Sequence, residues 1–215
     1  GDGYFFSTTV FLPALKTEKK NPESILVIWD NSFSGLQRNT TKELDFLSKY
    51  ILQLKNAEVN VITCNINTGA PKKFKITNGD ATALIQYIKS IPFDGATQLG
   101  KLDLSSIKEN EIILFTDGIS SFGEEEIKFG KIPVYSIISG TSADFSYLDF
   151  VSSASGGKLI NIGEKNTEDA LKEISTPSLT LYNYSSEKDI SAVYYDLHHN
   201  HGYGYTVSGI SSQKE

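Results

Sequence analysis

Short apolar runs alternate with amphipathic stretches between residues 25 and 175, and this alternation limits the possible folds more than any other feature of the chain. The apolar runs are rich in β-branched residues and cover residues 25–29, 59–64, 73–76, 111–115, 132–138 and 158–162. Several are almost wholly apolar, as expected of strands that are covered on both faces. The alternation predicts a three-layer α/β/α fold of the Rossmann-like type, with a mostly parallel sheet between two layers of helices.

The stretches between these runs have the periodicity of amphipathic helices. The clearest helix is predicted over residues 41–55, where leucine and isoleucine recur every three or four positions along one face. These residues are Leu44, Leu47, Ile51 and Leu54. Three further helices are predicted over residues 81–91, 145–155 and 167–174.

Both ends of the chain have the character of β-strands instead. Strands are predicted over residues 4–11, 178–184, 190–196 and 203–210, and we expect them to pair as a small antiparallel appendage, because domain termini often lie close together. Pro22 and Pro177 mark the expected boundaries. They divide the chain into an N-terminal strand segment (1–22), an α/β domain (23–176) and a C-terminal β appendage (177–215). The first residue is Gly1 rather than Met, which suggests a piece of a longer chain with further domains.

Composition and charge argue against two classes of function. The formal net charge is −6 and the basic residues are scattered, which argues against a nucleic-acid-binding surface. No apolar run is long enough to cross a bilayer, so we expect no membrane insertion by this segment. The single cysteine, Cys64, lies in an apolar run and is expected to be a packed strand thiol.

Oxygen-bearing side chains occur in three of the predicted loops. The first strand ends in the pattern D-x-S-x-S, formed by Asp30, Ser32 and Ser34. A loop of small residues presents the hydroxyl group of Thr97, and a later buried strand ends in Asp117 followed by glycine. Alternate positions in the first pattern allow one carboxylate and two hydroxyl groups to converge where the strand opens into a loop.

These loops are expected to meet at one edge of the sheet. Ligands of open α/β sheets bind outside the carboxyl ends of the strands, where the strand order reverses. If the strands that end near Asp30 and Asp117 are neighbours there, two carboxylates face one crevice, and a cation would relieve their repulsion. Hydroxyl groups with only two carboxylates suit Mg²⁺ better than Ca²⁺, although Mn²⁺ or Ca²⁺ are alternatives.

With these loops, the sequence resembles the von Willebrand factor A (vWA) family and its metal-ion-dependent adhesion site (MIDAS). Asp30, Ser32, Ser34, Thr97 and Asp117 match the five motif positions in order. The resemblance continues into residues 132–138 and 150–158. It implies that the two serines and the threonine contact the metal directly, that the acids often act through water, and that a carboxylate from a partner protein fills one remaining coordination position.

Two motif positions depart from the family pattern, and the flanks suggest a context. Phe33 stands where the family usually has glycine, and Gln98 follows the threonine where a small polar residue is common. Phe33 either crowds the metal face or offers the ligand an apolar contact. Residues 4–6 and 205–209 resemble VIT-domain and inter-alpha-trypsin-inhibitor-like bacterial proteins, which implies a periplasmic, cell-surface or secreted location.

The resulting hypothesis is a metal-dependent adhesion or protein-binding module rather than an enzyme. The motif loops contain no histidine, cysteine or lysine beside the carboxylates that could serve as a general base or nucleophile. Two alternatives remain open. One is a metal-dependent hydrolase that uses the same crevice, and the other is a structural spacer domain of a large surface protein.

Two further clusters have competing interpretations. His198, His199 and His201 could ligate a softer metal such as Zn²⁺, but Asn200 and Gly202 favour a polar connection between two strands. The acidic run at residues 124–126 could add negative potential near the metal. It is instead predicted to occupy the first turn of a helix, where the helix dipole favours acidic side chains.

Overall fold

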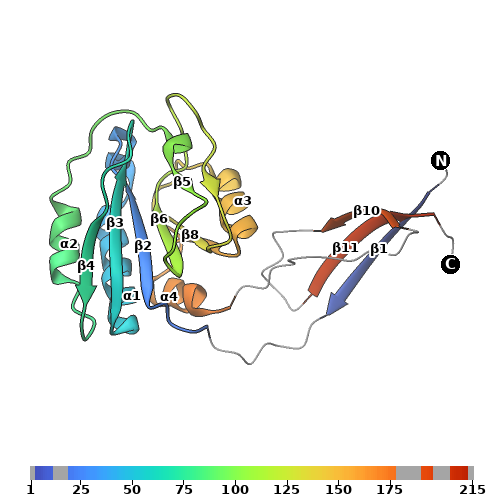
Figure 1. Ribbon diagram of the computed structural model, residues 1–215, viewed down its shortest axis with the longest axis horizontal. Helices are drawn as coiled ribbons and strands as arrows, with labels where there is room; N and C mark the ends of the chain where they lie inside the picture. Colours follow the sequence, from blue (N-terminus) through green and yellow to red (C-terminus); the bar gives the residue numbers. More distant parts are fainter. Residues whose placement is uncertain (1–2, 12–18, 178–189, 196–203, 213–215) are drawn as a thin grey trace. The chain divides into compact units, whose positions relative to one another are not determined.

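The computed structural model describes residues 3–11, 19–177, 190–195 and 204–212 (Figure 1). The chain divides into two compact units. One unit is Glu18–Pro177, and the other combines Gly1–Thr17 with Ser178–Glu215. The strand predicted over residues 178–184 lies outside the described residues, as do His198, His199 and His201.

A six-stranded sheet forms the centre of the unit Glu18–Pro177. Its order is β4-β3-β2-β6-β8-β9, and every neighbouring pair is parallel except β3 and β4. The strands are β2 (Ser24–Asp30), β3 (Ala57–Cys64), β4 (Lys72–Ile76), β6 (Glu111–Phe115), β8 (Val134–Ile138) and β9 (Lys158–Asn161). After β2, the chain adds β3 and β4 on one side of β2, and it then adds β6, β8 and β9 on the other side. The strand order therefore reverses between β2 and β6.

Helices cover both faces of this sheet, as predicted. Three helices share a core with one face: α1 (Thr40–Leu54), α2 (Thr82–Lys89) and α4 (Thr167–Ser175). Helix α3 (Phe145–Ser155) packs in a second core on the opposite face. Alternate side chains of β2 enter the two cores, with Val27 on the α1 side and Ile28 on the α3 side. Because both faces are covered, the central strands have almost no polar residues.

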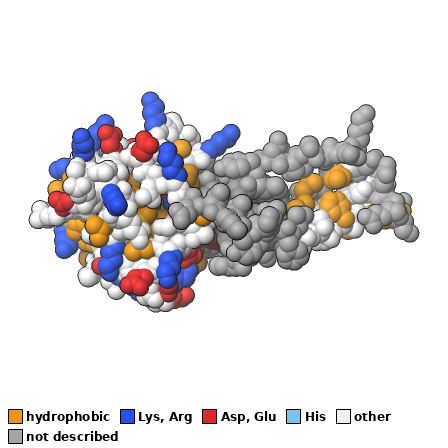
Figure 2. Space-filling view, turned by 90° about the horizontal axis from the view of Figure 1, so that it is seen from below, with side chains coloured by type: hydrophobic (Ala, Val, Ile, Leu, Met, Phe, Trp, Pro, Cys, Tyr) orange, Lys and Arg blue, Asp and Glu red, His pale blue; other side chains and the backbone are white. Residues whose placement is uncertain are grey.

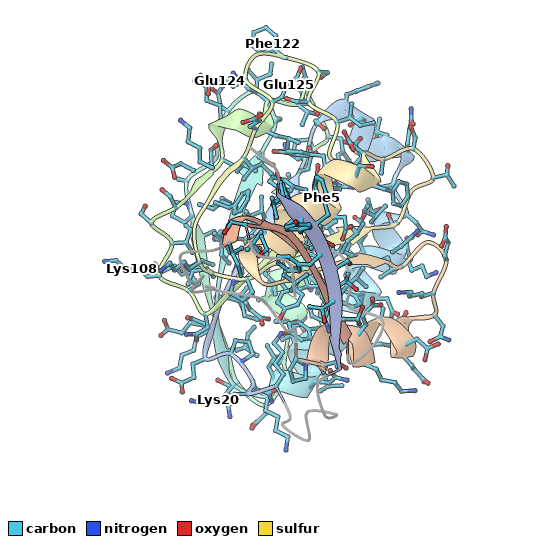
Figure 3. All side chains as sticks on the ribbon, turned by 90° about the vertical axis from the view of Figure 1, so that its right-hand side faces the viewer. Phe5, Lys20, Lys108, Phe122, Glu124 and Glu125 are labelled. Carbon is cyan, nitrogen blue, oxygen red and sulfur yellow. The ribbon has the colours of Figure 1, made fainter. Side chains whose placement is uncertain are left out.

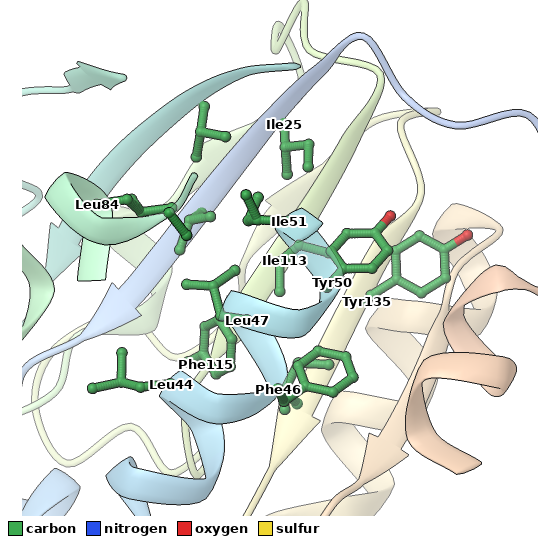
Figure 4. Close-up of a cluster of buried hydrophobic side chains, with 14 of the residues drawn as sticks. Ile25, Leu44, Phe46, Leu47, Tyr50, Ile51, Leu84, Ile113, Phe115 and Tyr135 are labelled. Carbon is green, nitrogen blue, oxygen red and sulfur yellow. The ribbon is translucent and has the colours of Figure 1, made fainter. Parts of the chain in front are cut away.

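Helix α1 shows how the sequence pattern becomes packing. The side chain of Asn39 accepts a hydrogen bond from the backbone N–H of Lys42 and caps the first turn. The helix ends before Lys55, whose positive φ of 64° takes the backbone out of the helical conformation. The apolar face predicted for this helix is buried, and Figure 4 shows Leu44, Leu47 and Ile51 turned toward the sheet. This face consists of Leu44, Leu47, Ile51 and Leu54.

The two ends of the chain form a separate three-stranded antiparallel sheet, which confirms the predicted appendage. Its order is β1-β11-β10, with β1 at Tyr4–Phe11, β11 at Gly204–Ser211 and β10 at Ile190–Tyr195. The pairing of β1 with β11 runs without a register shift from Tyr4 opposite Ser211 to Phe11 opposite Gly204.

Several short elements were not predicted. They are the 3₁₀ helices η1 (Phe33–Gln37) and η2 (Leu99–Lys101) and the parallel pair β5 (Asp103–Leu104) with β7 (Lys128–Phe129). The helix expected at residues 124–126 is wrong, because these residues lie in an exposed loop. Gly123, with a φ of 64°, precedes them, and Gly130 follows after three residues, so no length is left for a helix.

The surface of the α/β unit is mixed in charge on the face seen from below. Basic and acidic side chains are interspersed there, and no patch of one sign gathers on it (Figure 2). Within the described parts of the chain, none of the helices combines the length and the apolar character needed to span a bilayer.

Candidate metal centre

The two motif aspartates lie at the carboxyl edge of the sheet, at the ends of the two strands between which the order reverses. Asp30 is the last residue of β2, and Asp117 follows the end of β6 by two residues. The two strands are hydrogen-bonded parallel neighbours, with Trp29 opposite Phe115. The condition stated from the sequence, that these two strands are neighbours, is therefore met, and both carboxylates are carried to the edge where such sheets bind ligands.

Asp30 is completely buried and held through both of its carboxylate oxygens. Its Oδ1 accepts a hydrogen bond from the backbone N–H of Ser32 at 2.9 Å, and its Oδ2 accepts one from the hydroxyl group of Thr116 at 2.6 Å. The Thr116 hydroxyl in turn accepts the backbone N–H of Gly118 at 3.0 Å. One threonine thus connects Asp30 to the loop that carries Asp117. Thr116 was not among the site residues predicted from the sequence, although it directly precedes Asp117 in the motif.

The two motif serines are adjacent in space as well as in sequence. Their Oγ atoms are 3.2 Å apart, with Ser32 buried and Ser34 partly exposed. Two neighbouring oxygens on an octahedral Mg²⁺ are separated by about 3 Å, given metal–oxygen distances of about 2.1 Å. The spacing of the two hydroxyl groups therefore fits one edge of such an octahedron. The turn that follows the two serines needs a glycine, because a Cβ atom at Gly35 would lie 2.4 Å from the ring of Phe93.

Backbone hydrogen bonds fix the loops of Thr97 and Asp117 to each other. The carbonyl oxygen of Thr97 accepts the N–H groups of Ser121 and Phe122 at 2.9 and 3.1 Å. The Thr97 N–H donates to Oγ of Ser121 at 3.1 Å. Asp117, which is 5% exposed, accepts the N–H of Ile119 on its Oδ1 at 3.0 Å. Both side chains are therefore presented from a well-connected backbone.

A buried ion pair lies beside this site. Arg38 donates from Nη1 to the carbonyl oxygen of Phe115 at 2.9 Å, and its Nε is 3.3 Å from Oε1 of Glu43. Burial raises the pKa of Glu43, Arg38 opposes this effect, and the charges of Asp30 and Asp117 add to it. With all groups ionised, three buried carboxylates are balanced by one guanidinium group. Two negative charges at this edge thus lack a buried partner among these groups.

The two positions that depart from the family pattern have different environments. The side chain of Phe33 is 66% exposed, so it takes no buried place among the candidate ligands. Gln98 is buried, and its amide lies where a Cβ atom on Gly123 would stand. Gln98 therefore packs against the loop that follows Asp117.

The candidate ligands are mostly hydroxyl groups. No group of three or more histidine, cysteine, aspartate or glutamate side chains in the described residues is placed to hold a metal. Cys64 lies next to Asp30 on the neighbouring strand and is buried, as predicted. Burial raises the pKa of its thiol, and the charge of Asp30 raises it further, so the thiol stays protonated.

Comparisons with known proteins report on the fold of the chain. No family model and no curated protein matches its sequence. An aerotolerance-related membrane protein from Bacteroides fragilis NCTC 9343 matches in structure with a TM-score of 0.51 and 14% identity, over 70% of this chain and 96% of that one. BatB from Bacteroides thetaiotaomicron matches with a TM-score of 0.51 and 15% identity, over 71% and 97% of the two chains.

The ArnB paralog VWA2 from Sulfolobus acidocaldarius matches with a TM-score of 0.57 and 12% identity. The match covers 97% of this chain and 66% of that chain. At such low identities the likeness establishes the fold alone, and it agrees with the three-layer arrangement described above. The chain has the fold of a von Willebrand factor A domain.

Proposed function

We propose that the carboxyl edge of the sheet binds a divalent cation and uses it to bind a carboxylate of a partner protein. Ser32, Ser34 and Thr97 contact the ion directly, and Asp30 and Asp117 neutralise its charge. Mg²⁺ is the preferred ion, because it accepts a few protein oxygens and keeps several waters, and Mn²⁺ or Ca²⁺ can replace it.

The observation that carries this proposal is the pair of buried carboxylates at the ends of two adjacent strands. Asp30 is fully buried and Asp117 is 5% exposed, while Arg38 is already paired with Glu43. Burial of an ionised carboxylate without a counter-charge is strongly unfavourable. A cation between the two carboxylates removes this penalty, and the spacing of the serine hydroxyl groups supports an octahedral ion.

The chain itself orients the oxygens that such an ion needs. Hydrogen bonds from Ser32 and Thr116 keep the Asp30 carboxylate in one rotamer, and the N–H of Ile119 does the same for Asp117. When bound, the ion supplies a fixed positive charge with an exchangeable position that favours a hard oxygen ligand. A partner's aspartate or glutamate is the protein group that fits this position best.

We propose binding rather than catalysis at this edge. A hydrolase would need a nucleophile or a general base in reach of its substrate. Cys64 is buried with a raised pKa, and the serine hydroxyl groups are assigned to the ion. Screening the protein on phosphate and peptide esters with Mg²⁺ tests the alternative, and metal-dependent turnover that Asp30→Ala abolishes would favour the hydrolase.

We also propose an extracytoplasmic location within a longer surface protein. The flanking resemblance to VIT-domain proteins supports it, and one structural neighbour is described as a membrane protein. The chain spans 66% of the Sulfolobus neighbour, so further domains fit this proposal. Fractionation of the source cells checks the location, and recovery with cytoplasmic markers would contradict it.

Calorimetric titration with Mg²⁺ tests the metal site. We expect binding to the wild type, weaker binding to Ser34→Ala, which loses one direct ligand, and no binding to Asp30→Ala. Ser105→Ala is the matched control, because Ser105 is exposed and its hydroxyl group donates a hydrogen bond to Asp103. Equal binding to the wild type and Asp30→Ala, or none to either, refutes the metal site.

The role of a partner carboxylate needs a second measurement. A short synthetic peptide with a central aspartate is expected to bind in Mg²⁺ and to be released by EDTA. The same peptide with asparagine in place of aspartate is the control, since it keeps the shape and loses the charge. If the protein binds Mg²⁺ but binds the two peptides equally well, the ion only connects the loops, and the alternative of a spacer domain is favoured.

A further inference from the structure

Exposed apolar side chains gather around the candidate metal centre. Seven large hydrophobic side chains are exposed in the described part of the unit Glu18–Pro177, and two of them, Leu52 and Phe150, lie on helices α1 and α3. The other five all lie in the segments that follow the carboxyl ends of β2, β3 and β6, two of them in η1. We call these five side chains the apolar rim: Phe33, Leu36, Ile66, Ile119 and Phe122.

The backbone of the apolar rim is the backbone that positions the candidate ligands. Phe33 stands between Ser32 and Ser34, and its N–H donates to the carbonyl oxygen of Gly95 at 2.9 Å. The N–H of Ile119 donates to Asp117, and the N–H of Phe122 donates to the carbonyl oxygen of Thr97. Hydrogen bonds of the ligand-bearing loops therefore fix the backbone of these three rim residues.

Packing within the domain does not account for this exposure. Phe33 is 66% and Phe122 57% exposed, so most of each ring faces solvent. Apolar side chains that surround a polar centre are typical of binding sites, because they are buried when the partner arrives. They also exclude water from the central contact, which strengthens the attraction between a cation and a carboxylate.

The exposed charged residues of the loops at this edge of the sheet are all acidic. The loops at residues 31–39, 65–71, 92–98, 116–126 and 139–144 contain one basic residue, Arg38, and it is buried. Their exposed charged residues are Asp94, Glu124, Glu125, Glu126 and Asp144. Figure 3 shows Phe122, Glu124 and Glu125 together at one end of the unit, with Lys20 at the opposite end. Exposed Lys72 lies directly after the loop at residues 65–71, and exposed Lys101 lies three residues after the loop at residues 92–98; the five acidic side chains outnumber these two lysines. A purely acidic partner segment would therefore be repelled by the net charge of this surface, whereas a basic residue would be attracted.

We propose that this surface binds a protein segment in which the ligating aspartate or glutamate is flanked by apolar side chains and by lysine or arginine. The inference rests on the proposed function, since it requires the cation and the partner carboxylate. The apolar rim supplies affinity by burial. The exposed acidic residues select for the basic neighbour and against segments that carry only acids.

The test uses short fluorescent peptides with a central aspartate and three kinds of flank, and it uses the full chain. One peptide has apolar residues and lysines, one has serine in place of the apolar residues, and one has glutamate in place of the lysines. In saturating Mg²⁺ we expect the first peptide to bind about tenfold more tightly than either of the others, because a few buried apolar groups and favourable charges are worth roughly this factor.

Variants of the chain assign the effect to the surface. The double variant Phe33→Ser and Phe122→Ser, which we call the rim variant, is expected to bind the first peptide about tenfold more weakly. Glu124→Gln, Glu125→Gln and Glu126→Gln together are expected to reduce the preference for lysine over glutamate. Leu52→Ser is the matched control, because it removes an equally exposed apolar side chain from α1, outside the rim.

The outcomes separate this inference from the proposed function. Mg²⁺ binding with equal affinity for the three peptides overturns the inference and leaves the metal site standing. A loss of affinity in Leu52→Ser as large as that in the rim variant also overturns it. Absence of Mg²⁺ binding by the wild type overturns both. Flank selectivity that disappears in EDTA and in the rim variant supports it.

Discussion

Thr116 joins the two halves of the candidate metal centre through one hydroxyl group. It donates to Asp30 and accepts from Gly118, and it is fully buried. We expect Thr116→Val to lower the Mg²⁺ affinity about tenfold, because groups that orient metal ligands typically matter by this factor. The free energy of unfolding should fall by about 1–3 kcal/mol, since the N–H of Gly118 loses its acceptor. Calorimetry and urea unfolding measure the two effects.

Ser136→Ala is the control for this substitution. Ser136 is also fully buried and accepts a hydrogen bond from the hydroxyl group of Ser152 at 2.8 Å, but it lies in the middle of β8. Its loss should reduce stability and leave Mg²⁺ binding unchanged. If both variants bind Mg²⁺ like the wild type, the connection from Thr116 to Asp30 has no role in the metal site.

Glu43 should make stability depend on pH. Burial raises its pKa above the ordinary value of 4.5, so the folded state holds this proton more tightly than the unfolded state does. Its contribution to stability is therefore complete below pH 4.5 and is lost as the pH rises through the folded-state pKa. In EDTA, we expect the wild type to lose stability over this range relative to Glu43→Gln. Parallel profiles of the two proteins in urea unfolding would contradict this assignment.

At the scale of elements, a buried cluster connects the amino end of β6 to helix α1 and to the segment before β2. Glu111 accepts a hydrogen bond from the hydroxyl group of Tyr50, and its Oε2 is 2.7 Å from Nζ of Lys19. The Lys19 ammonium group also lies 4.0 Å from the ring centroid of Tyr135 and donates to the carbonyl oxygen of Ile174. Burial lowers the pKa of Lys19, and Glu111 opposes this effect.

Loss of Lys19 should therefore destabilise the α/β unit. Lys19→Met leaves the Glu111 carboxylate buried without its cation, and we expect the free energy of unfolding to fall by about 3 kcal/mol. Urea unfolding measures this change. Lys20→Met is the control, because the side chain of Lys20 is 89% exposed and its ion pair with Glu23 is worth at most about 1 kcal/mol. Similar decreases in the free energy of unfolding of the two variants would show that the ion pair of Lys19 stabilises the fold no more than the exposed ion pair of Lys20 does.

At the scale of the whole molecule, the α/β unit contains all of the candidate ligands and both hydrophobic cores. We expect a fragment of residues 18–177 to fold cooperatively and to gain thermal stability from Mg²⁺, because an ion that binds only the folded state stabilises it. Circular dichroism during heating, with and without Mg²⁺, measures both properties. A fragment that starts at residue 23 loses Lys19 and should melt at a lower temperature. An unfolded 18–177 fragment would contradict the independence of this unit.

The sequence by itself was sufficient to predict the longer elements and to name candidate residues for the site. Hydrophobic periodicity is a local property, so β6 and α3 begin and end where the pattern predicts, and α1 is shifted by a single residue at each end. The five oxygen-bearing positions could be read as a motif for the same reason. Elements of two residues, such as β5 and β7, have no periodicity to detect, and the acidic run at residues 124–126 resembled a helix start without the length to form one.

Only the tertiary structure decided how these parts meet. Asp30 and Thr116 are 86 positions apart, and their hydrogen bond exists because β2 and β6 are neighbours in the sheet. The imbalance of buried charge depends on Arg38 being already paired with Glu43. The apolar rim emerges in the same way, since three separate loops bring Phe33, Ile66 and Phe122 to one edge. Long-range strand pairing, rather than local pattern, sets these distances, and so the sequence could name the candidate ligands but not their surroundings.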